Sequence, residues 1–379
     1  MSTKDGADLL AAIGLGQEAF WTFINEWARR QVQGLLEVVL QGLLQERLQA
    51  RWNQRSEQRL GHRNGFYLRG LLTPHGPLQV KVPRLRQGRW DCSTVFDRYQ
   101  RRLADVNRIL RRMFLAGTST RATAELAEQV FGGRLSHQTV SQVLRWLDER
   151  LAAWRNRPLQ PWYRAIFIDG MHVNARDGDQ VVVVVMALRE DQTKEVLGFS
   201  TQAGESCREL LWNLRRRGLE NVDLFVSDDS AAIRSAVAEV FPTSAWQSCC
   251  LHRLMGLREQ IGPTDYRHEM VAQASGIFRC KTSLAAADRA RTWQDRWRPV
   301  APWAVQNFMN GLSDSLAFYA LPETWWRRTR TNNLLERLIR TLRMRLRNMG
   351  VFHDVPAIER AVFGQLARWH LIPELTHSS

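Results

Sequence analysis

The sequence is poor in cysteine, in lysine and in long apolar runs. Its 379 residues include five irregularly spaced cysteines, which excludes a small disulfide-stapled secreted scaffold and favours a reducing, cytoplasmic setting. No run of about 18 apolar residues occurs, so no membrane span is expected. The N-terminal stretch MSTKDGADLLAAIGLG has neither a basic segment nor a long apolar core, and it predicts no signal peptide.

The sequence is rich instead in aromatic residues and in arginine. Hydrophobic residues make up 44% of the chain, with 15 tryptophans and 15 phenylalanines, which is enough for a packed core. The net charge of +15 and the pI of about 10.6 favour a polyanionic partner, above all nucleic acid. Only four of the basic residues are lysines, and arginine suits contacts with phosphates and base edges. The codon usage of a GC-rich genome would explain the arginine excess equally well, but it does not explain the net charge.

Residues 1–102 are expected to form a helix followed by a small β element. Apolar residues recur at helical spacing between residues 8 and 51. Between residues 60 and 100, Gly and Pro indicate turns, and GPLQVKVPRL alternates as a strand does. The region is interpreted as a DNA-binding or dimerisation module, with a solvated hairpin as the alternative. Its candidate phosphate contacts are Arg63, Arg69, Lys81, Arg84 and Arg86.

Residues 103–157 show the pattern of a helix-turn-helix. In STRATAELAEQVFGGRLSHQTVSQVL, a capped short helix ends at Gly-Gly and a second helix begins near Ser136. Small polar side chains lie at the start of the second helix, where a recognition helix contacts DNA. The candidate DNA contacts of this module are Arg121, His137, Gln138 and Thr139.

Residues 158–250 give the clearest order of elements. Strands are expected near 164–173, 180–190, 195–202, 222–229 and 245–250, and helices near 206–218 and 230–241. The order β-β-β-α-β-α-β predicts an antiparallel meander followed by crossovers to parallel strands, so the fold class is α/β. Residues 251–325 are expected to be helical. Residues 326–379 are expected to return to the core through helices at 331–349 and 354–371.

Three carboxylates are expected to converge on this core. Asp169 and Asp228 end the first and fourth strands, where side chains of an α/β sheet meet in one crevice. Glu336 is the one acid in an arginine-rich helix, and it lies beside the apolar stripe of that helix. Carboxylates grouped in this way are typical of Mg²⁺ sites for phosphoryl transfer. A simple helix pair between Glu336 and Arg340 is the alternative.

The helix that carries Glu336 has two further sets of residues. The expected apolar stripe consists of Leu335, Leu338, Leu342, Leu346 and Met349. The candidate contacts to a DNA backbone are Arg337, Arg340, Arg343 and Arg347.

Several segments resemble a known family. FIDGMHV, LFVSDDSAAI, AWQSCCLHRL and TNNLLERLIRTLRMR resemble the signature blocks of the Mutator-type DDE transposases of bacterial insertion sequences. GHRNGFYLRGLLTPHGPLQVKVPRLR and the helix-turn-helix segment resemble the DNA-binding blocks of that family, so the resemblance covers residues 55–365. It implies an RNase H-like catalytic core with an all-helical insertion, preceded by helical and helix-turn-helix DNA-binding modules.

The resemblance also implies the site residues and their cofactor. Asp169, Asp228 and Glu336 match the metal-binding triad of the family, which holds two Mg²⁺ ions per active site, with Mn²⁺ as a substitute. Cys249 and His252 match its Cys-x-x-His pair, and His252 is the candidate contact to the scissile phosphate. The implied activity is strand cleavage and strand transfer by a two-metal mechanism.

The implied partner is double-stranded DNA, both the terminal inverted repeats of a transposon and the target DNA. Because two ends must be brought together, a homodimer is the simplest active form. The expected location is the cytoplasm, at the nucleoid when the protein is bound to DNA.

Three questions stay open in the sequence. The family commonly has Gly after its second Asp, where this chain has Asp229, so either Asp228 or Asp229 could be the ligand; Asp229 is interpreted as a helix N-cap. Cys249 and His252 lack a second Cys/His pair at matching spacing, so a structural zinc site is not expected. The alternative functions are a structure-specific RNase H-like nuclease and a non-catalytic, domesticated DNA-binding protein.

Overall fold

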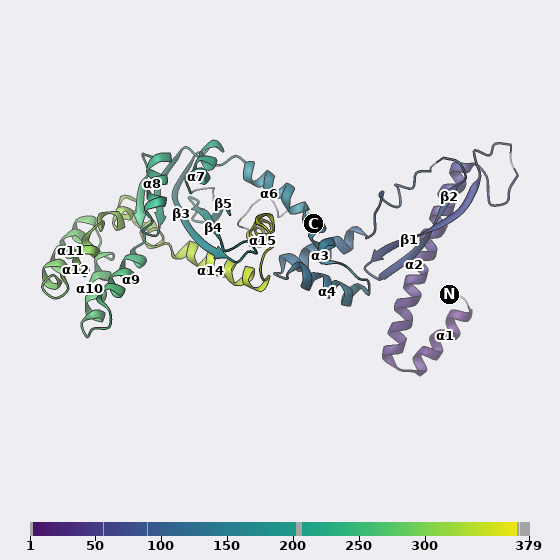
Figure 1. Cartoon of the computed structure of the whole chain (residues 1–379), viewed down its shortest axis with the longest axis horizontal. Helices are drawn as coiled ribbons and strands as arrows, with labels where there is room; N and C mark the ends of the chain where they lie inside the picture. The colour runs from purple at the N-terminus through teal and green to yellow at the C-terminus, as the bar shows by residue number, and fades with distance from the viewer. Residues whose placement is uncertain (1–2, 56, 89, 202–206, 370, 372–379) are drawn as a thin grey trace. The chain divides into compact units, whose positions relative to one another are not determined.

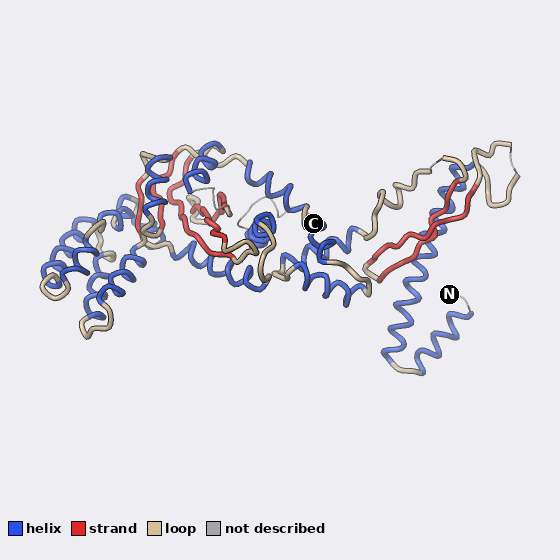
Figure 2. The backbone as a smooth tube through the Cα atoms, viewed as in Figure 1, coloured by secondary structure: helices blue, strands red, loops and turns tan. Residues whose placement is uncertain are grey.

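The computed structural model describes residues 3–55, 57–88, 90–201, 207–369 and 371. The chain divides into two compact units, residues 1–144 and residues 145–379, and each is described by itself. Figure 1 traces the chain through both units, and Figure 2 shows that each contains strands as well as helices. The first unit has a two-stranded sheet and the second a five-stranded sheet.

The first unit begins with two helices, α1 (Thr3–Gly14) and α2 (Gln17–Leu48). The expectation of a single helix over residues 8–51 is wrong, because the chain turns at Leu15 and Gly16. Gly16 has a φ of 103°, a backbone conformation that glycine adopts without steric cost. The Gly-Leu-Gly sequence before α2 was the available signal for this break.

An antiparallel hairpin of β1 (Arg63–Thr73) and β2 (Gly76–Leu85) packs on α2. The Thr73 hydroxyl donates a hydrogen bond to the Gly76 carbonyl at 2.8 Å and closes the turn. The apolar face of the hairpin and Phe96 pack against Leu40 of α2. The small β element expected from the sequence is therefore present and has its own core.

Three short helices complete the first unit: α3 (Ala104–Leu115), α4 (Thr120–Phe131) and α5 (His137–Leu144). The Ser119 side chain caps the start of α4, and Gly132 ends α4 with a φ of 64°. The shared core of this region includes Leu72, Val106, Leu110, Ala127, Phe131 and Val143.

The second unit is built on a five-stranded mixed sheet. Its strands are β3 (Trp162–Val173), β4 (Gln180–Leu188), β5 (Lys194–Ser200), β6 (Asn221–Ser227) and β7 (Ala245–Ser248). Their spatial order is β5-β4-β3-β6-β7. β3, β4 and β5 form an antiparallel meander, and β6 and β7 run parallel to β3. This arrangement confirms the order of elements along the chain and the strand directions that the sequence predicts.

Helices cover both faces of this sheet. α7 (Cys207–Arg216) and α8 (Ala231–Val240) share a buried core with Ile168 of β3 on one face. On the other face, α14 (Asn333–Asn348) packs against β3 and α15 (Val355–Arg368) packs against α14. The sheet is therefore the middle layer of a mixed α/β unit.

One helix within the expected 103–157 module lies in the second unit. This helix is α6 (Trp146–Asn156), and its Trp154 is buried. The Trp154 ring lies 5.6 Å from the rings of both Phe199 in β5 and Phe363 in α15, measured between centroids. Arg155 Nη2 adds an ion pair with Glu359 of α15 at 2.6 Å.

Between β7 and α14 the chain is helical. The helices are α9 (Cys250–Ile261), α10 (Arg267–Ile277), α11 (Ser283–Trp297), α12 (Pro302–Met309) and α13 (Glu323–Thr329), with two 3₁₀ turns before α13. Buried tryptophan side chains, including Trp293 and Trp297, pack among them. Among the described residues of both units, no helix is long and apolar enough to cross a membrane.

Candidate active site

β3 contains Asp169, and Asp228 directly follows β6. The expectation that Asp169 ends its strand is wrong, because β3 stays paired with β4 as far as Val173. The two strands are parallel neighbours, and Phe167 pairs with Val226. Asp169 lies two residues past Phe167, and Asp228 lies two residues past Val226. The two carboxylates are close enough for the charge of Asp228 to raise the pKa of Asp169. Ile168 points into the core under α7 and α8. Because side chains alternate along a strand, Asp169 points to the opposite face, where α14 lies.

α14 brings Glu336 to this face of the sheet, and Asn332 fixes the start of the helix to the sheet. Asn332 is fully buried, and its side-chain amide donates to the Ile168 carbonyl at 3.2 Å. Its backbone N–H donates to Cys249 Sγ at 3.3 Å. Asn332 was not among the candidate residues expected from the sequence; the Asn332–Asn333 pair at the start of α14 was the available signal.

α9 brings a histidine and a cysteine to the same place. Donor atoms of Cys249, His252 and Glu336 all lie within 4.8 Å of one another. His252 Nε2 is 3.9 Å from Glu336 Oε1. The Cys249 side chain raises the pKa of His252 to about 9, aided by the charges of Glu336 and Asp228 and opposed by burial. The raised pKa favours the protonated form of His252, whose positive charge offsets part of the carboxylate charge.

The carboxylates repel one another across this site. Burial raises the pKa of Asp169 to about 6; a 2.8 Å hydrogen bond from the Gly170 N–H opposes this shift, and the charges of Asp228 and Glu336 add to it. Among the described residues, Asp228 Oδ1 and Glu336 Oε1 are buried without a hydrogen-bond partner.

These carboxylates fit a hard cation. An unpartnered buried polar atom costs about 1–3 kcal/mol, so a cation between the oxygens would remove that cost together with the repulsion. A donor set of carboxylate oxygens suits Mg²⁺ or Mn²⁺ rather than a softer metal. The residues that converge here are therefore chemically suited to the ion that the sequence predicts.

Asp229 is turned away from this group. Its carboxylate pairs with Arg253 Nη2 at 3.2 Å, and its side chain is 65% exposed. The expectation that Asp229 caps the following helix is wrong, because the Ser230 side chain accepts the Ile233 N–H instead. Asp228 is therefore the member of the pair that faces the other carboxylates.

The Cys249, His252 and Glu336 cluster does not form a separate zinc centre of the structural kind. It offers three donor atoms, whereas structural zinc takes four. The neighbouring Cys250 thiol is directed elsewhere and donates to the Ser315 carbonyl at 3.2 Å. Because Glu336 belongs to both groups, we assign the cluster to the carboxylate site.

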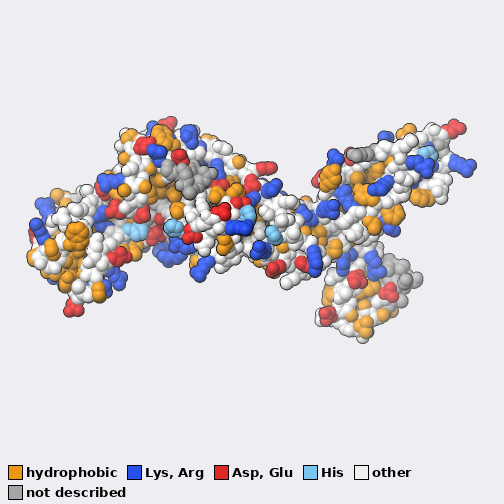
Figure 3. Space-filling view, viewed as in Figure 1, with side chains coloured by type: hydrophobic (Ala, Val, Ile, Leu, Met, Phe, Trp, Pro, Cys, Tyr) orange, Lys and Arg blue, Asp and Glu red, His pale blue; other side chains and the backbone are white. Residues whose placement is uncertain are grey.

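The arginines of α14 lie on its outer side. All four candidate DNA contacts on this helix, Arg337, Arg340, Arg343 and Arg347, are exposed. Figure 3 shows basic side chains on the surface over α14. The basic side of the helix that carries Glu336 is therefore open to a ligand.

The candidate DNA contacts of the first unit differ in whether their side chains are exposed or already bonded within the unit. Lys81, Arg84, Arg86, Arg121, His137 and Gln138 are exposed. Arg63 and Arg69 instead donate to backbone carbonyls of their own unit, Arg63 to residue 51 at 3.3 Å and Arg69 to residue 97 at 2.8 Å. Thr139 is half-buried, and its hydroxyl lies 3.1 Å from Ser136 Oγ.

Comparison with known proteins finds a matching family model and relatives that are all transposases. The model of the family described as "Transposase, Mutator family" matches residues 10–370. The transposase for insertion sequence element ISRM5 of Rhizobium meliloti (strain 1021) is 28% identical over 342 residues, covering 88% of this chain and 85% of the relative.

Two further relatives are also transposases of insertion sequence elements. The transposase for IS256 in transposon Tn4001 of Staphylococcus aureus is 28% identical and covers 82% of each chain. The transposase for IS406 of Burkholderia multivorans (strain ATCC 17616 / 249) is 30% identical, covering 82% of this chain and 81% of the relative. With a family model that spans nearly its whole length, the chain belongs to the Mutator family of transposases.

Proposed function

We propose that this transposase cleaves and transfers DNA strands at the carboxylate site, on an RNase H-like core. The observation that carries the proposal is the convergence of Asp169, Asp228 and Glu336 from β3, β6 and α14, with buried unpartnered oxygens on two of them. The strand order β5-β4-β3-β6-β7, with a meander followed by parallel strands, supports the RNase H-like assignment. The helical segment between β7 and α14 occupies the position in the chain where an RNase H-like core of this family is expected to have a helical insertion.

Asp169, Asp228 and Glu336 are the residues that would hold two Mg²⁺ ions. When bound, the ions supply activation of the attacking water or 3′-hydroxyl and stabilisation of the leaving oxygen. The chain itself contributes the fixed positions of these carboxylates. Asn332 holds the first turn of α14 against Ile168 of β3 and so keeps Glu336 beside the two aspartates.

The basic groups at the site would hold the DNA strand. Protonated His252 lies next to Glu336, where it can donate a hydrogen bond to the scissile phosphate. Arg340, Arg343 and Arg347 follow Glu336 at spacings that place them along one side of α14. They would contact successive phosphates and keep the strand aligned with the carboxylates.

The first unit supplies groups for binding the ends of the element. Its exposed basic residues on the hairpin and at the start of α5 would contact terminal inverted repeats. A homodimer would bring the two ends together. Membership of the transposase family and the exposure of the basic side chains support the proposed contacts with DNA.

The test is a strand-transfer assay with Mg²⁺ on a labelled inverted-repeat duplex. Glu336→Gln should lower the rate by more than about 100-fold, since even residues behind a metal's ligands are worth 10–100-fold. The matched control is Glu323→Gln, an exposed acid in the first turn of α13, which should behave as wild type. Wild-type activity of Glu336→Gln would remove the carboxylate site from the reaction. Hydrolysis without joined products would favour a nuclease instead.

A further inference from the structure

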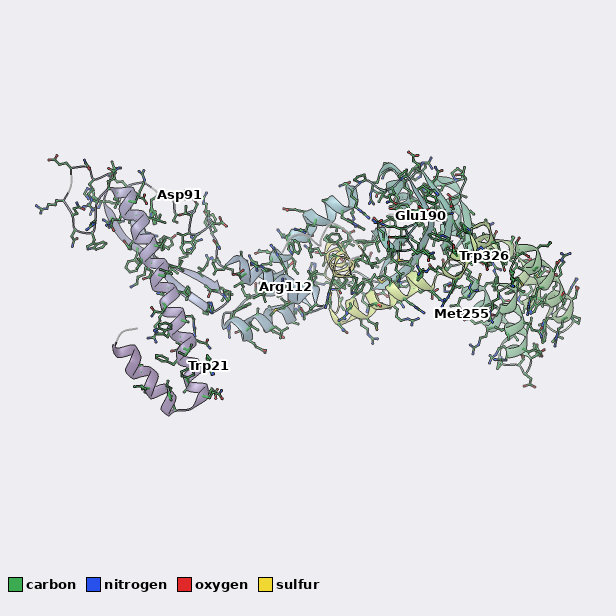
Figure 4. The ribbon with its side chains drawn as sticks, turned by 180° about the vertical axis from the view of Figure 1, so that it is seen from behind. Trp21, Asp91, Arg112, Glu190, Met255 and Trp326 are labelled. Carbon is green, nitrogen blue, oxygen red and sulfur yellow. The ribbon has the colours of Figure 1, made fainter. Side chains whose placement is uncertain are left out.

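A large cavity lies in the first unit, between the hairpin and the segment that follows it. Its volume is about 940 Å³, and it is lined by residues of β1, of β2, by Gly88 and by residues of the segment 90–101. Figure 4 labels Asp91 in this segment, seen from behind. Pockets for small ligands are typically about 300–1,000 Å³, so the cavity has room for a nucleotide.

Aromatic rings form part of the walls. Tyr67, Trp90, Phe96 and Tyr99 all line the cavity. The Trp90 indole N–H donates to the Pro83 carbonyl at 2.8 Å, which fixes the ring against β2. Phe96 is only 3% exposed, so its ring forms the buried base of the cavity. The cavity therefore presents flat apolar surfaces that are already held in place.

Arginine guanidinium groups lie over three of these rings. The Arg69 guanidinium lies 4.8 Å from the centre of the Phe96 ring, and Arg84 lies 5.1 Å from that of Tyr67. Arg98 lies 5.0 Å from the centre of the Tyr99 ring. The one acid among the lining residues, Asp91, accepts hydrogen bonds from Ser93. The lining is therefore cationic and suits an anion that also has a planar apolar face.

Tyr99 is held in an unusual conformation at this cavity. Its φ is 64°, a left-handed backbone that bulky side chains rarely adopt. The Gln100 side chain accepts the Asp97 N–H at 2.9 Å, and the Gln100 N–H donates to the Asp97 carbonyl at 3.1 Å, so the turn is braced from both sides. The strained backbone displays an aromatic ring that is 78% exposed. Strain of this kind is concentrated at functional sites.

We propose that this cavity binds an unpaired nucleotide, with its base stacked on Tyr99 and its phosphate held by Arg84 and Arg98. The inference rests on the proposed function, because the nucleotide would belong to DNA bound by the transposase. A base-paired duplex keeps its bases stacked on one another and offers no base face to an aromatic ring. The DNA source is therefore a single-stranded overhang or an extruded base, and a free nucleotide is the competing source of the same chemistry.

The test uses the full-length protein and two DNA duplexes of equal length, one blunt and one with a short 3′ overhang containing 2-aminopurine. Wild-type protein should bind the overhang duplex more tightly and quench the 2-aminopurine fluorescence. Tyr99→Ala should weaken overhang binding roughly tenfold, abolish the quenching and leave blunt-duplex binding unchanged. Tyr99→Phe should retain both signals, because the ring is kept.

Two controls separate stacking from damage to the fold. Trp52→Ala removes another exposed ring of the same unit, 66% exposed with Arg63 over it and outside the cavity lining, and it should change nothing. Tyr99→Gly relieves the backbone strain, so its melting temperature should equal or exceed that of wild type while overhang binding is lost.

Two outcomes would overturn the proposal. One is overhang binding and quenching by Tyr99→Ala at the wild-type level. The other is full displacement of the overhang by deoxynucleoside monophosphate at an equal nucleotide concentration, which would assign the cavity to free nucleotides. Neither outcome affects the carboxylate site, which is tested separately by the loss of strand transfer in Glu336→Gln.

Discussion

At the scale of single residues, the site depends on a buried amide as well as on its carboxylates. Asp169, Asp228 and Glu336 could be chosen from the sequence because acids that follow apolar runs, and a lone acid in a basic helix, are visible there. Asn332 could not, because its bonds to the Ile168 carbonyl and to Cys249 join elements far apart in the chain. The choice between Asp228 and Asp229 likewise needed the Arg253 ion pair, which the sequence does not show.

The crowding of carboxylates predicts a pH dependence of stability. The pKa of Asp169 is about 6 in the folded chain, against an ordinary value of 3.8. The folded state therefore holds this proton more tightly than the unfolded chain, so its contribution to stability is full below about pH 4 and is lost as the pH rises through about 6. Asp169→Asn should stabilise the metal-free protein at pH 7.5 by on the order of 1 kcal/mol.

The measurement for this prediction is thermal unfolding in EDTA between pH 4.5 and pH 7.5. The gain of Asp169→Asn over wild type should be small at pH 4.5 and largest at pH 7.5. Added Mg²⁺ should stabilise wild type and not the variant. An Asn variant that is no more stable than wild type at pH 7.5 would show that the carboxylates do not strain the fold.

At the scale of the element, α14 shows that helical periodicity predicts a buried stripe but not every residue in it. Its buried stripe is Leu335, Ile339, Leu342, Leu346 and Met349. The expected stripe had Leu338 in place of Ile339, and Leu338 is only half-buried. Adjacent apolar residues are equivalent in a periodicity argument, so the packing of α14 against β3 decides which of the two is buried.

This correction predicts different costs for two neighbouring substitutions. Ile339→Ala removes a side chain that is 3% exposed and should cost about 2–4 kcal/mol of unfolding free energy. Leu338→Ala should cost about 1 kcal/mol or less. Urea unfolding of both variants checks the prediction, and equal costs would mean that α14 is rotated from the position described.

At the scale of the whole chain, the order of helices and strands along the sequence was predictable and the division into units less so. The alternation of short apolar runs with helical segments determines the mixed sheet of the second unit. The break between units falls at residues 144 and 145, inside a helical region where composition does not change. The position of α6 depends on Trp154, Phe199 and Phe363, which meet only in the folded chain.

The second unit also depends on a buried charge network that no sequence pattern indicated. Glu195 of β5 is 5% exposed and pairs with Arg157 at 2.9 Å and with Arg189 at 2.8 Å. Glu195→Gln should destabilise the unit by about 3–5 kcal/mol, because it leaves buried arginine charge uncompensated. Glu190→Gln removes an exposed pair at 3.9 Å and should cost less than about 1 kcal/mol. Calorimetry of both variants tests this, and similar melting temperatures would contradict it.

We propose that Asp169, Asp228 and Glu336 hold one shared group of metal ions and that Asp229 does not. The most direct measurement is a titration of Mn²⁺ into the DNA-bound protein, followed by electron paramagnetic resonance, for wild type, Asp228→Asn and Asp229→Asn. We expect two ions per active site in wild type and in Asp229→Asn, and a loss of ion binding in Asp228→Asn. Normal ion binding by Asp228→Asn, or its loss in Asp229→Asn, would contradict this assignment of the metal ligands.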